Sequence, residues 1–385
     1  MTKLPALRLY FAVQLLVAAT QLHAQSWPMF RGNPQQTGIA SCTLPEKPTL
    51  LWQFKAGEAI VSTAAISDHM VYVGCDNGTL YALHLADGKV KWQTHTSPST
   101  QPSSAPSTQP SRPSIQSSPT VSGDLVLFGD QDGVFHSVAR ADGLPRWTFQ
   151  TNGEVISSAN CWKDRVVFGS YDNHLYCLKL ADGALLWKFE TEGRVHGTPA
   201  IAGDKALVSG CDGKLRAIGL LDGKQASEVD LGGYSGASAA VSGHTAFVGT
   251  FTNQVVGVDW AAGKILWNYE NPDRQFPFYS SAALTDQRVF IGGRDKTLHA
   301  IDPKSGKAVW AFRAKGRIDS SPVVVGSRVF VGSTDGLLYA VDAADGRGSW
   351  QYDAGSPISA SPAVGEGRLV VGTEDGVVFC FGEKK

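Results

Sequence analysis

Short apolar segments alternate with polar, glycine-rich turns along most of the chain. The clearest copy of the pattern runs from Ser320 to Trp350. It begins with Ser-Ser-Pro, has two apolar segments that end at a glycine, and continues with an Asp-Gly turn, a third apolar segment, a second Asp-Gly turn and a tryptophan. The glycine that closes the second segment recurs as Gly74, Gly129, Gly169, Gly210, Gly249, Gly292, Gly332 and Gly372. These glycines lie about 40 residues apart, which is the period of a propeller blade built from four short strands.

Each apolar segment predicts one β-strand. Val329 to Val331 is β-branched and aromatic and stops at Gly332, and the Asp-Gly pair at Gly336 supplies the positive φ that a tight hairpin turn needs. The second Asp-Gly pair, at Gly346, leads into a fourth strand that carries Trp350. Eight copies therefore predict an all-β fold, an eight-bladed β-propeller with four-stranded antiparallel blades.

A tryptophan follows the second turn glycine by four residues in most copies. A large aromatic residue at a fixed place in each blade buries most area between neighbouring sheets, so we expect these residues to seal the blade seams. They are Trp92, Trp147, Trp187, Trp267, Trp310 and Trp350. Blade 4 has Ser227 at this position, which predicts a looser seam between blades 4 and 5.

The two ends of the repeat array complement each other. The eighth repeat stops after its third strand, at Val377 to Phe381, and an unassigned strand-like segment with Trp52, Leu50 to Phe54, precedes the first repeat. Pairing them would complete the eighth blade and leave no exposed strand edge at an end of the array. We therefore expect an N-terminal strand to close the ring.

The first residues have the features of a secretory signal. Lys3 and Arg8 precede an apolar run, Leu9 to Ala19, that is too short to span a bilayer, and Ala24 suits a signal peptidase. We expect a signal peptide over 1–24, an N-terminal extension over 25–49 and the propeller over 50–385, in a periplasmic or secreted protein. The first cysteine is Cys42, so a lipid anchor at the cleavage site is not expected.

Composition adds two further expectations. Residues 97–114 are rich in Pro, Ser and Thr and cannot bury enough apolar surface to order themselves, so we expect a disordered insert between blades 1 and 2. The whole sequence carries 34 Lys and Arg against 35 Asp and Glu, and no segment concentrates basic residues. Nucleic acid is therefore not an expected partner, and we expect a monomer.

The six cysteines do not form a disulfide framework, although export would permit one. Cys75 and Cys211 occupy one repeat position, and Cys177 and Cys380 occupy another. Equivalent positions of different blades are too far apart to bridge, so free and mostly buried thiols are expected.

Two motifs resemble a known superfamily. The Asp-x-x-x-Gly-Lys-x-x-Trp element, at 259–267 and 302–310, resembles the tryptophan-docking repeat of pyrroloquinoline-quinone-type propellers, and the segment from Trp27 to Gly38 resembles the start of many exported members. The resemblance covers 27–382 apart from the insert. It implies either a BamB-type scaffold that helps insert outer-membrane barrels through protein contacts, or a quinoprotein dehydrogenase. The length is similar to that of the scaffold branch, and no two cysteines are adjacent as in the dehydrogenases.

The central channel offers little for quinone catalysis. The residues expected to face it are Val61, Gln116, Ile156, His196, Gly236, Tyr279, Asp319 and Ser359. A Ca²⁺ ion bound to the quinone takes about six to eight oxygen ligands, and this set of residues contains only one carboxylate, which is too few. We therefore expect no cofactor, no metal and no enzymatic activity.

A binding surface is the better candidate. The loops that enter the innermost strands should share one face and carry arginines and aromatic residues, the residue types that anchor protein interfaces. The predicted partner-binding residues are Arg194, His196, Tyr234, Arg274, Phe276, Phe278, Tyr279, Arg317 and Asp319. A carbohydrate-binding or sensing module and a quinone-dependent dehydrogenase remain as alternatives.

Overall fold

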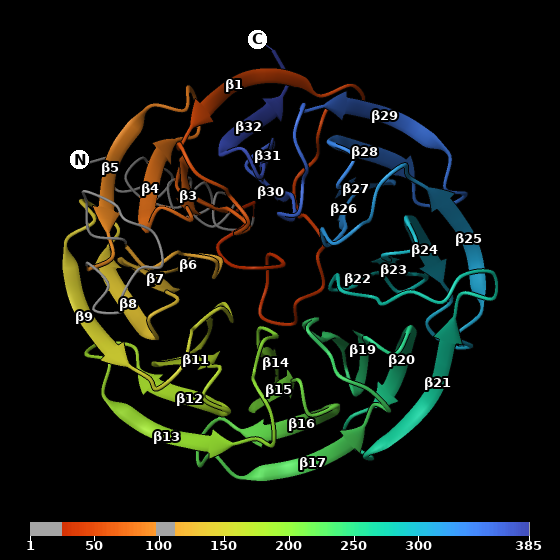
Figure 1. The fold of residues 1–385 in the computed structure, drawn as a ribbon, viewed down its shortest axis with the longest axis horizontal. Coiled ribbons are helices and arrows are strands. Elements are labelled where there is room, and N and C mark those ends of the chain that lie inside the picture. The colour runs from red at the N-terminus through yellow and green to blue at the C-terminus, as the bar shows by residue number, and fades with distance from the viewer. Residues whose placement is uncertain (1–24, 98–111, 385) are drawn as a thin grey trace, which may run out of the picture.

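Eight four-stranded antiparallel sheets stand around a central channel (Figure 1). The computed structural model describes residues 25–97 and 112–384. The eight-bladed propeller predicted from the repeats is thus confirmed. The predicted signal segment and most of the predicted insert lie outside the described residues.

The strands follow one order in each blade, from the channel outward. The innermost strands are β2 (Ala65–Ser67), β6 (Thr120–Ser122), β10 (Asn160–Trp162), β14 (Ala200–Ala202), β18 (Ala240–Ser242), β22 (Ala283–Leu284), β26 (Val323–Val325) and β30 (Ala363–Gly365). The second strands are β3 (Met70–Gly74), β7 (Leu125–Gly129), β11 (Arg165–Gly169), β15 (Lys205–Ser209), β19 (Thr245–Gly249), β23 (Val289–Gly292), β27 (Arg328–Gly332) and β31 (Arg368–Gly372). The third strands are β4 (Thr79–His84), β8 (Val134–Ala139), β12 (His174–Lys179), β16 (Lys214–Gly219), β20 (Gln254–Asp259), β24 (Thr297–Ile301), β28 (Leu337–Asp342) and β32 (Val377–Gly382). The outer strands are β5 (Val90–His95), β9 (Pro145–Gln150), β13 (Leu185–Glu190), β17 (Gln225–Asp230), β21 (Lys264–Glu270), β25 (Ala308–Arg313), β29 (Gly348–Asp353) and β1 (Thr49–Lys55).

The ring is closed by the strand that precedes the first repeat. β1 pairs antiparallel with β32, placing Leu50 opposite Phe381 and Phe54 opposite Val378 (Figure 1). This sheet has the order β1-β32-β31-β30, so the first and last strands of the propeller form one blade. The prediction drawn from the two incomplete ends is confirmed.

Two faces of the ring follow from the strand order. The loops that connect an outer strand to the next innermost strand lie on one face, which we call the entry face, together with the turns between second and third strands. The remaining turns lie on the opposite face, which we call the turn face. The face that an element presents therefore depends on its place in the 40-residue repeat.

Five of the six docked tryptophans lie against a turn glycine of the following blade, and the sixth, Trp350, packs against Phe381 of blade 8. The indole of Trp147 donates from Nε1 to the carbonyl of Leu180 at 3.1 Å, and a Cβ on Gly183 would lie 2.5 Å from its ring. Gly183 also has a φ of +72°. In blade 4 the Ser227 hydroxyl donates to the carbonyl of Trp260, and no aromatic ring lies near Gly263. The hydrogen bond of the seam is kept there, while the indole packing is lost.

The aspartate of the entry-face turn joins neighbouring blades. Asp335 accepts from the amide of Leu337 at 2.9 Å and from the hydroxyl of Tyr339 at 2.8 Å within its own blade. It also accepts from the amides of Lys315 and Gly316, in the loop that enters the blade, at 2.9 and 3.0 Å. This carboxylate therefore has the structural role expected of a turn residue.

The N-terminal extension makes a circuit of the channel at the turn face (Figure 1). Its backbone carbonyls accept from amides of successive blades, and its bonds reach the loop or innermost strand of all eight. The hydrogen-bonded pairs are Gln25 with Glu366, Trp27 with Ile66, Pro28 with Val121, Pro34 with Asn160 and Ile201, Gln35 with Val241, Thr37 with Leu284, and Gly38 with Val324. The extension thus ties the blades together from the inside.

Arg31 anchors this extension within the protein. Its side chain is fully buried, and Nη2 donates to the carbonyls of Ala282 at 3.0 Å and Pro322 at 2.5 Å. Burial lowers the pKa of its guanidinium to about 9. The two carbonyls belong to blades 6 and 7, so one side chain fixes the extension to both.

The cysteines within the described residues are free, and four of the six are buried. This agrees with the expectation from their repeat positions. At the end of the predicted insert, Pro113 is buried and its carbonyl accepts from the Thr96 hydroxyl at 3.1 Å, while Ser114 donates to Asp76. These residues belong to the loop that enters blade 2. Among residues 25–97 and 112–384, no helix is long and apolar enough to cross a membrane.

Candidate functional site

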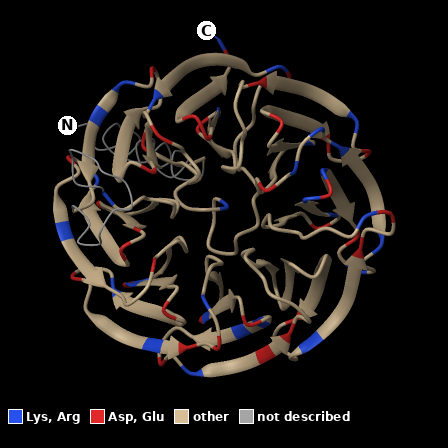
Figure 2. Cartoon of the chain, in the orientation of Figure 1, with Lys and Arg blue, Asp and Glu red and all other residues tan. Residues whose placement is uncertain are grey.

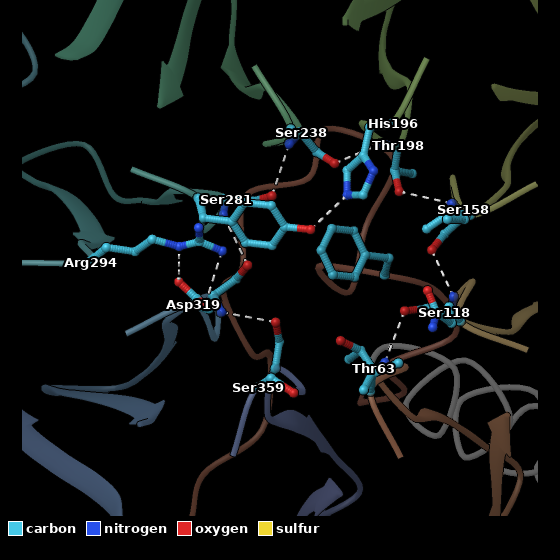
Figure 3. A pocket seen from close by; sticks show the side chains of 18 residues that line it. Thr63, Ser118, Ser158, His196, Thr198, Ser238, Ser281, Arg294, Asp319 and Ser359 are labelled. Carbon is cyan, nitrogen blue, oxygen red and sulfur yellow. Dashed lines mark hydrogen bonds and ion pairs between the residues drawn. The ribbon is translucent and has the colours of Figure 1, made fainter. Parts of the chain in front are cut away.

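The channel forms a cavity of about 350 Å³ (Figure 3). All eight residues predicted to face the channel line it, one from each entry loop. Phe30 of the N-terminal extension lines it too, and the extension crosses the channel at the turn face. The cavity is therefore a well with its mouth on the entry face.

A ring of hydroxyl groups surrounds the well. Its members are Thr63, Ser118, Ser158, Thr198, Ser238, Ser281, Ser321 and Ser361, and each stands two residues before an innermost strand. From Thr63 to Ser321, the amide of each residue donates to the hydroxyl of the next blade, as from Ser281 to Ser321 at 2.9 Å. Seven such bonds, of 2.7 to 3.2 Å, link the blades in sequence. The second serine of the Ser-Ser-Pro motif is thus an inter-blade acceptor.

The first serine of the motif acts within its blade. The hydroxyl of Ser280 donates to the carbonyl of Gly292 at 2.9 Å and accepts from the amide of the same glycine at 2.8 Å. This pair of bonds holds the entry loop against the end of the second strand. The repeated motif therefore serves folding first, and the well is a consequence of eight copies facing inward.

Two residues that line the well, His196 and Tyr279, form a partly buried hydrogen-bonded trio with Tyr171. His196 lies between Tyr171 and Tyr279, with the Tyr171 hydroxyl 2.5 Å from Nδ1 and the Tyr279 hydroxyl 3.1 Å from Nε2. Burial lowers the pKa of His196 and raises those of both tyrosines, which keeps the trio uncharged near pH 7. A neutral imidazole donates from one nitrogen and accepts at the other, so it can accept only one of the two hydroxyl protons.

An ion pair stands beside this trio. Arg294 donates to Asp319 in a two-point contact, from Nε at 2.9 Å and from Nη2 at 3.3 Å (Figure 3). Its guanidinium carbon also lies 4.8 Å from the ring centroid of Tyr279. The only carboxylate among the eight predicted channel residues is therefore already bound to a cation.

These residues do not fit a quinone with its Ca²⁺. A hard cation needs several oxygen ligands, and the single carboxylate of the well, Asp319, is held by Arg294. In the described part of the chain, no group of three or more His, Cys, Asp or Glu side chains is placed to hold a metal ion. Beside apolar and aromatic side chains and His196, the polar lining of the well consists of hydroxyls, one amide and one internal ion pair.

Above the well, the entry loops of blades 4 to 7 carry exposed arginines and aromatic side chains. Tyr234 is 63% exposed and Phe276 is 47% exposed. Arg194 and Arg317 are also exposed, and Arg274 is partly exposed. None of these three guanidinium groups forms an ion pair with a described residue, although Arg194 lies over the ring of Tyr171 at 5.0 Å.

The predicted surface set divides into three groups. Arg194, Tyr234, Arg274, Phe276 and Arg317 are accessible on the entry face, as expected. Phe278 is not, because it is 1% exposed and packs against Tyr269 and His299 in the core. Its repeat position is the apolar one before the channel residue, where Val195 and Ile318 are also buried.

The third group lines the well. His196, Tyr279 and Asp319 face the channel and not the outer surface. Sequence reasoning did not find Arg294, Tyr171 or Phe30. The first two lie in turns between second and third strands, two residues beyond the end of the second strand, and no motif marks them. The position of Phe30 depends on the path of the N-terminal extension, which no rule of the repeat predicts.

Charge is spread around the ring. Lys and Arg side chains alternate with Asp and Glu on the turns and outer strands (Figure 2). The unpaired arginines above blades 4 to 7 are therefore a local feature of the entry loops.

Comparison with protein families decides the classification. The family model described as outer membrane protein assembly factor BamB matches residues 40–150, 133–276 and 273–384. The chain belongs to this BamB family. Its propeller, the closing strand and the tryptophan-docking repeats are thus those of a BamB-family member, and the resemblance seen in the sequence is confirmed.

Individual relatives are distant. BamB of Yersinia pestis is 29% identical over 87 residues, which is 23% of this chain and 18% of the length of that protein. The crystal structure of BamB from Moraxella catarrhalis has a TM-score of 0.72 at 16% identity, covering 87% of this chain and 100% of that one. Quinohemoprotein alcohol dehydrogenase from Comamonas testosteroni has a TM-score of 0.75 at 12% identity, covering 96% of this chain and 82% of that one. At such identities the structural likeness shows the shared fold alone.

Proposed function

We propose that this BamB-family protein is a non-enzymatic scaffold of the bacterial envelope, which binds a protein partner through the entry face of blades 4 to 7. The observation that carries the proposal is the cluster of two exposed aromatic side chains, Tyr234 and Phe276, among three arginines without ion-pair partners in the described residues. Aromatic residues and arginine are the types enriched at interface hot spots.

The same surface suggests the chemistry of the partner. At the repeat position of Arg194, Tyr234 and Arg317, blades 1 to 3 carry Ala59, Ser114 and Glu154. At this repeat position, cationic and aromatic side chains therefore occur in blades 4, 5 and 7 and not in blades 1 to 3. A partner segment that combines carboxylates with an apolar side chain would be complementary to it. Family membership supports a partner in outer membrane protein assembly.

The absence of catalysis is the second part of the proposal. The well holds one carboxylate, bound by Arg294, and a trio kept neutral by burial. A carboxylate base beside a metal-bound quinone would need a free carboxylate and further oxygen ligands. Addition of pyrroloquinoline quinone and Ca²⁺ to the purified protein should give no dye-linked oxidation of alcohols or sugars. Oxidation above the rate without protein would contradict this part.

Site-specific photo-crosslinking in cells tests the surface. A photoreactive phenylalanine at Tyr234 or at Phe276 should crosslink the same polypeptide, and that polypeptide should be a component of the outer-membrane assembly machinery. Leu144 and Leu221 are matched controls, because they are 61% and 60% exposed in turns on the turn face. Equal crosslinking from both faces, or none from the entry face, would refute the proposed interface.

A charge-reversal experiment tests the arginines separately. Arg194→Glu and Arg317→Glu should each weaken binding of that purified component at least tenfold at low salt, because interface charges act through long-range attraction. The thermal midpoint of the scaffold should not change, since both side chains are exposed. Unchanged affinity in both variants would exclude electrostatic recognition at this face.

A further inference from the structure

The well has the size and the closure of a small-molecule site. Its volume of about 350 Å³ lies at the lower end of the range for ligand pockets, roughly 300 to 1,000 Å³. The entry face is open, and the extension with Phe30 crosses the opposite end. A bound molecule would therefore enter beside the proposed protein interface and stop at an aromatic side chain.

The hydroxyl ring presents unused donors to this space. Seven of its oxygens accept an amide of the preceding blade, from Ser118 onward to Ser361. The ring residues are 3 to 6% exposed, and none of these hydroxyls donates to a protein acceptor among the described residues. A hydroxyl has one proton to donate, and a buried donor without an acceptor is costly. An acceptor-rich molecule in the well would satisfy them.

The side chains of blades 4 to 7 that line the well add both hydrogen-bond donors and acceptors. The Arg294 guanidinium retains Nη1 beyond its two-point contact with Asp319, and the carboxylate oxygens retain lone pairs. The hydroxyl of Tyr279, which lines the well 3.1 Å from His196 Nε2, adds a group that can both donate and accept. Adjacent donors and acceptors of this kind are complementary to vicinal hydroxyl groups.

The lining of the well carries no net charge, so it is not complementary to an ionic ligand. Arg294 and Asp319 compensate each other, and no other charged side chain lines the cavity. Burial lowers the pKa of His196, so the imidazole adds no charge near neutral pH. An anion would lack an unpaired cation, and a cation would lack an unpaired carboxylate.

We infer that the well binds a small, neutral, polyhydroxylated molecule, a monosaccharide or cyclic polyol. Its hydroxyls would accept from the ring and bridge Arg294 and Asp319, and its C–H face would lie toward Phe30. This site is distinct from the proposed protein interface, because the interface residues Tyr234 and Phe276 lie outside the cavity. The inference does not depend on the identity of any protein partner.

Saturation-transfer NMR on the full mature protein tests the inference directly. The probes are glucose, N-acetylglucosamine and myo-inositol, with citrate as an anion of similar size. At least one of the neutral probes should show saturation transfer that is lost on competition with another of them. Binding of citrate alone, or of none of the four, would overturn the assignment.

Two variants locate the binding. Val61→Trp should occlude the cavity from its apolar side without removing a polar group, and Asp319→Asn should remove the carboxylate and leave Arg294 uncompensated. Each variant should bind the neutral probe at least tenfold more weakly than the wild type. Tyr234→Ala is the matched control, because it alters the protein interface and leaves the well intact. Unchanged binding in folded Val61→Trp would place the site elsewhere and refute the inference, while loss of protein binding in Tyr234→Ala alone would concern only the interface.

Discussion

Gly346, in the turn between β28 and β29 of blade 7, lies against the indole of Trp310 in blade 6. A Cβ added at Gly346 would lie 2.5 Å from Cε3 of that indole. The glycine also has a φ of +75°. The tryptophan of one blade and the turn glycine of the next are therefore one structural unit, although 36 residues separate them in the sequence.

Gly346→Ala should destabilise the fold by more than its backbone strain alone. The left-handed conformation costs a non-glycine residue about 1 to 2 kcal/mol, and the clash with Trp310 adds a cost of overpacking of about 1 to 3 kcal/mol. Gly355→Ala is the control, because its φ is +78° and its added Cβ would meet nothing within 4 Å. Equal losses in urea unfolding would show that the indole moves aside freely.

The seam between blades 4 and 5 should open before the others. Ser227 donates the hydrogen bond of this seam to the Trp260 carbonyl but supplies no indole. The side chain of Trp260 is only partly buried against the core of blades 4 and 5. Hydrogen exchange should therefore be faster in β17 than in β13, whose Trp187 docks on Gly223. Ser227→Trp should slow it, since only the Glu228 carbonyl lies within 4 Å of a Cβ at Gly263. Uniform protection across both seams would argue against this account.

The sequence predicts those features that repeat. The period, the turn glycines and the tryptophans identified eight blades, and the missing strand identified the pairing of segment 50–54 with segment 377–381. The channel residues were placed correctly because each occupies one position of the motif. Phe278 was misplaced because its loop carries three aromatic residues close together, Phe276, Phe278 and Tyr279, and only the fold shows which one takes the buried position. Arg294 and Phe30 come from segments where no repeat rule applies, so their convergence on the well could not be predicted.

The hydroxyl ring should contribute measurably to stability. Ser321→Ala would leave the buried amide of Ser281 without its acceptor, at a cost of about 1 to 3 kcal/mol. Ser321→Thr should restore most of this stability, because Thr198 accepts from Ser158 at the same position of another blade. Chemical unfolding of the two variants measures the difference. If both variants lost the same stability, the packing of the side chain and not its oxygen would be responsible.

Acid should weaken the link that Asp335 makes between blades 6 and 7. Burial acts to raise its pKa, but hydrogen bonds from Leu337, Tyr339 and the loop amides outweigh burial and hold the pKa below its usual value. The stabilisation is therefore present above the unfolded pKa of about 3.9 and is lost as the pH falls through the lower folded value. Asp335→Asn should cost on the order of 2 kcal/mol at pH 7. Its difference from the wild type should shrink below pH 4, and a difference independent of pH would contradict the assignment.

The N-terminal extension should stabilise the whole ring and not only the blade that it follows in sequence. Trp27 is 1% exposed, exchanges two backbone hydrogen bonds with Ile66, and fills the space beside Gly32. Trp27→Ala should therefore cost about 3 to 5 kcal/mol, the usual range for a buried aromatic residue replaced by alanine. Because the extension bonds to all eight blades, its loss should lower protection from hydrogen exchange in every innermost strand.

Trp162→Ala is the control for that experiment. Trp162 ends the innermost strand of blade 3, is only partly buried, and has Lys163 at 4.2 Å from its ring centroid. Its replacement should cost less and should affect exchange in blade 3 alone. If Trp27→Ala also affected only blade 1, where Ile66 lies, the extension would be a local cover, and the blades would hold together through their seams and hydroxyl ring without it.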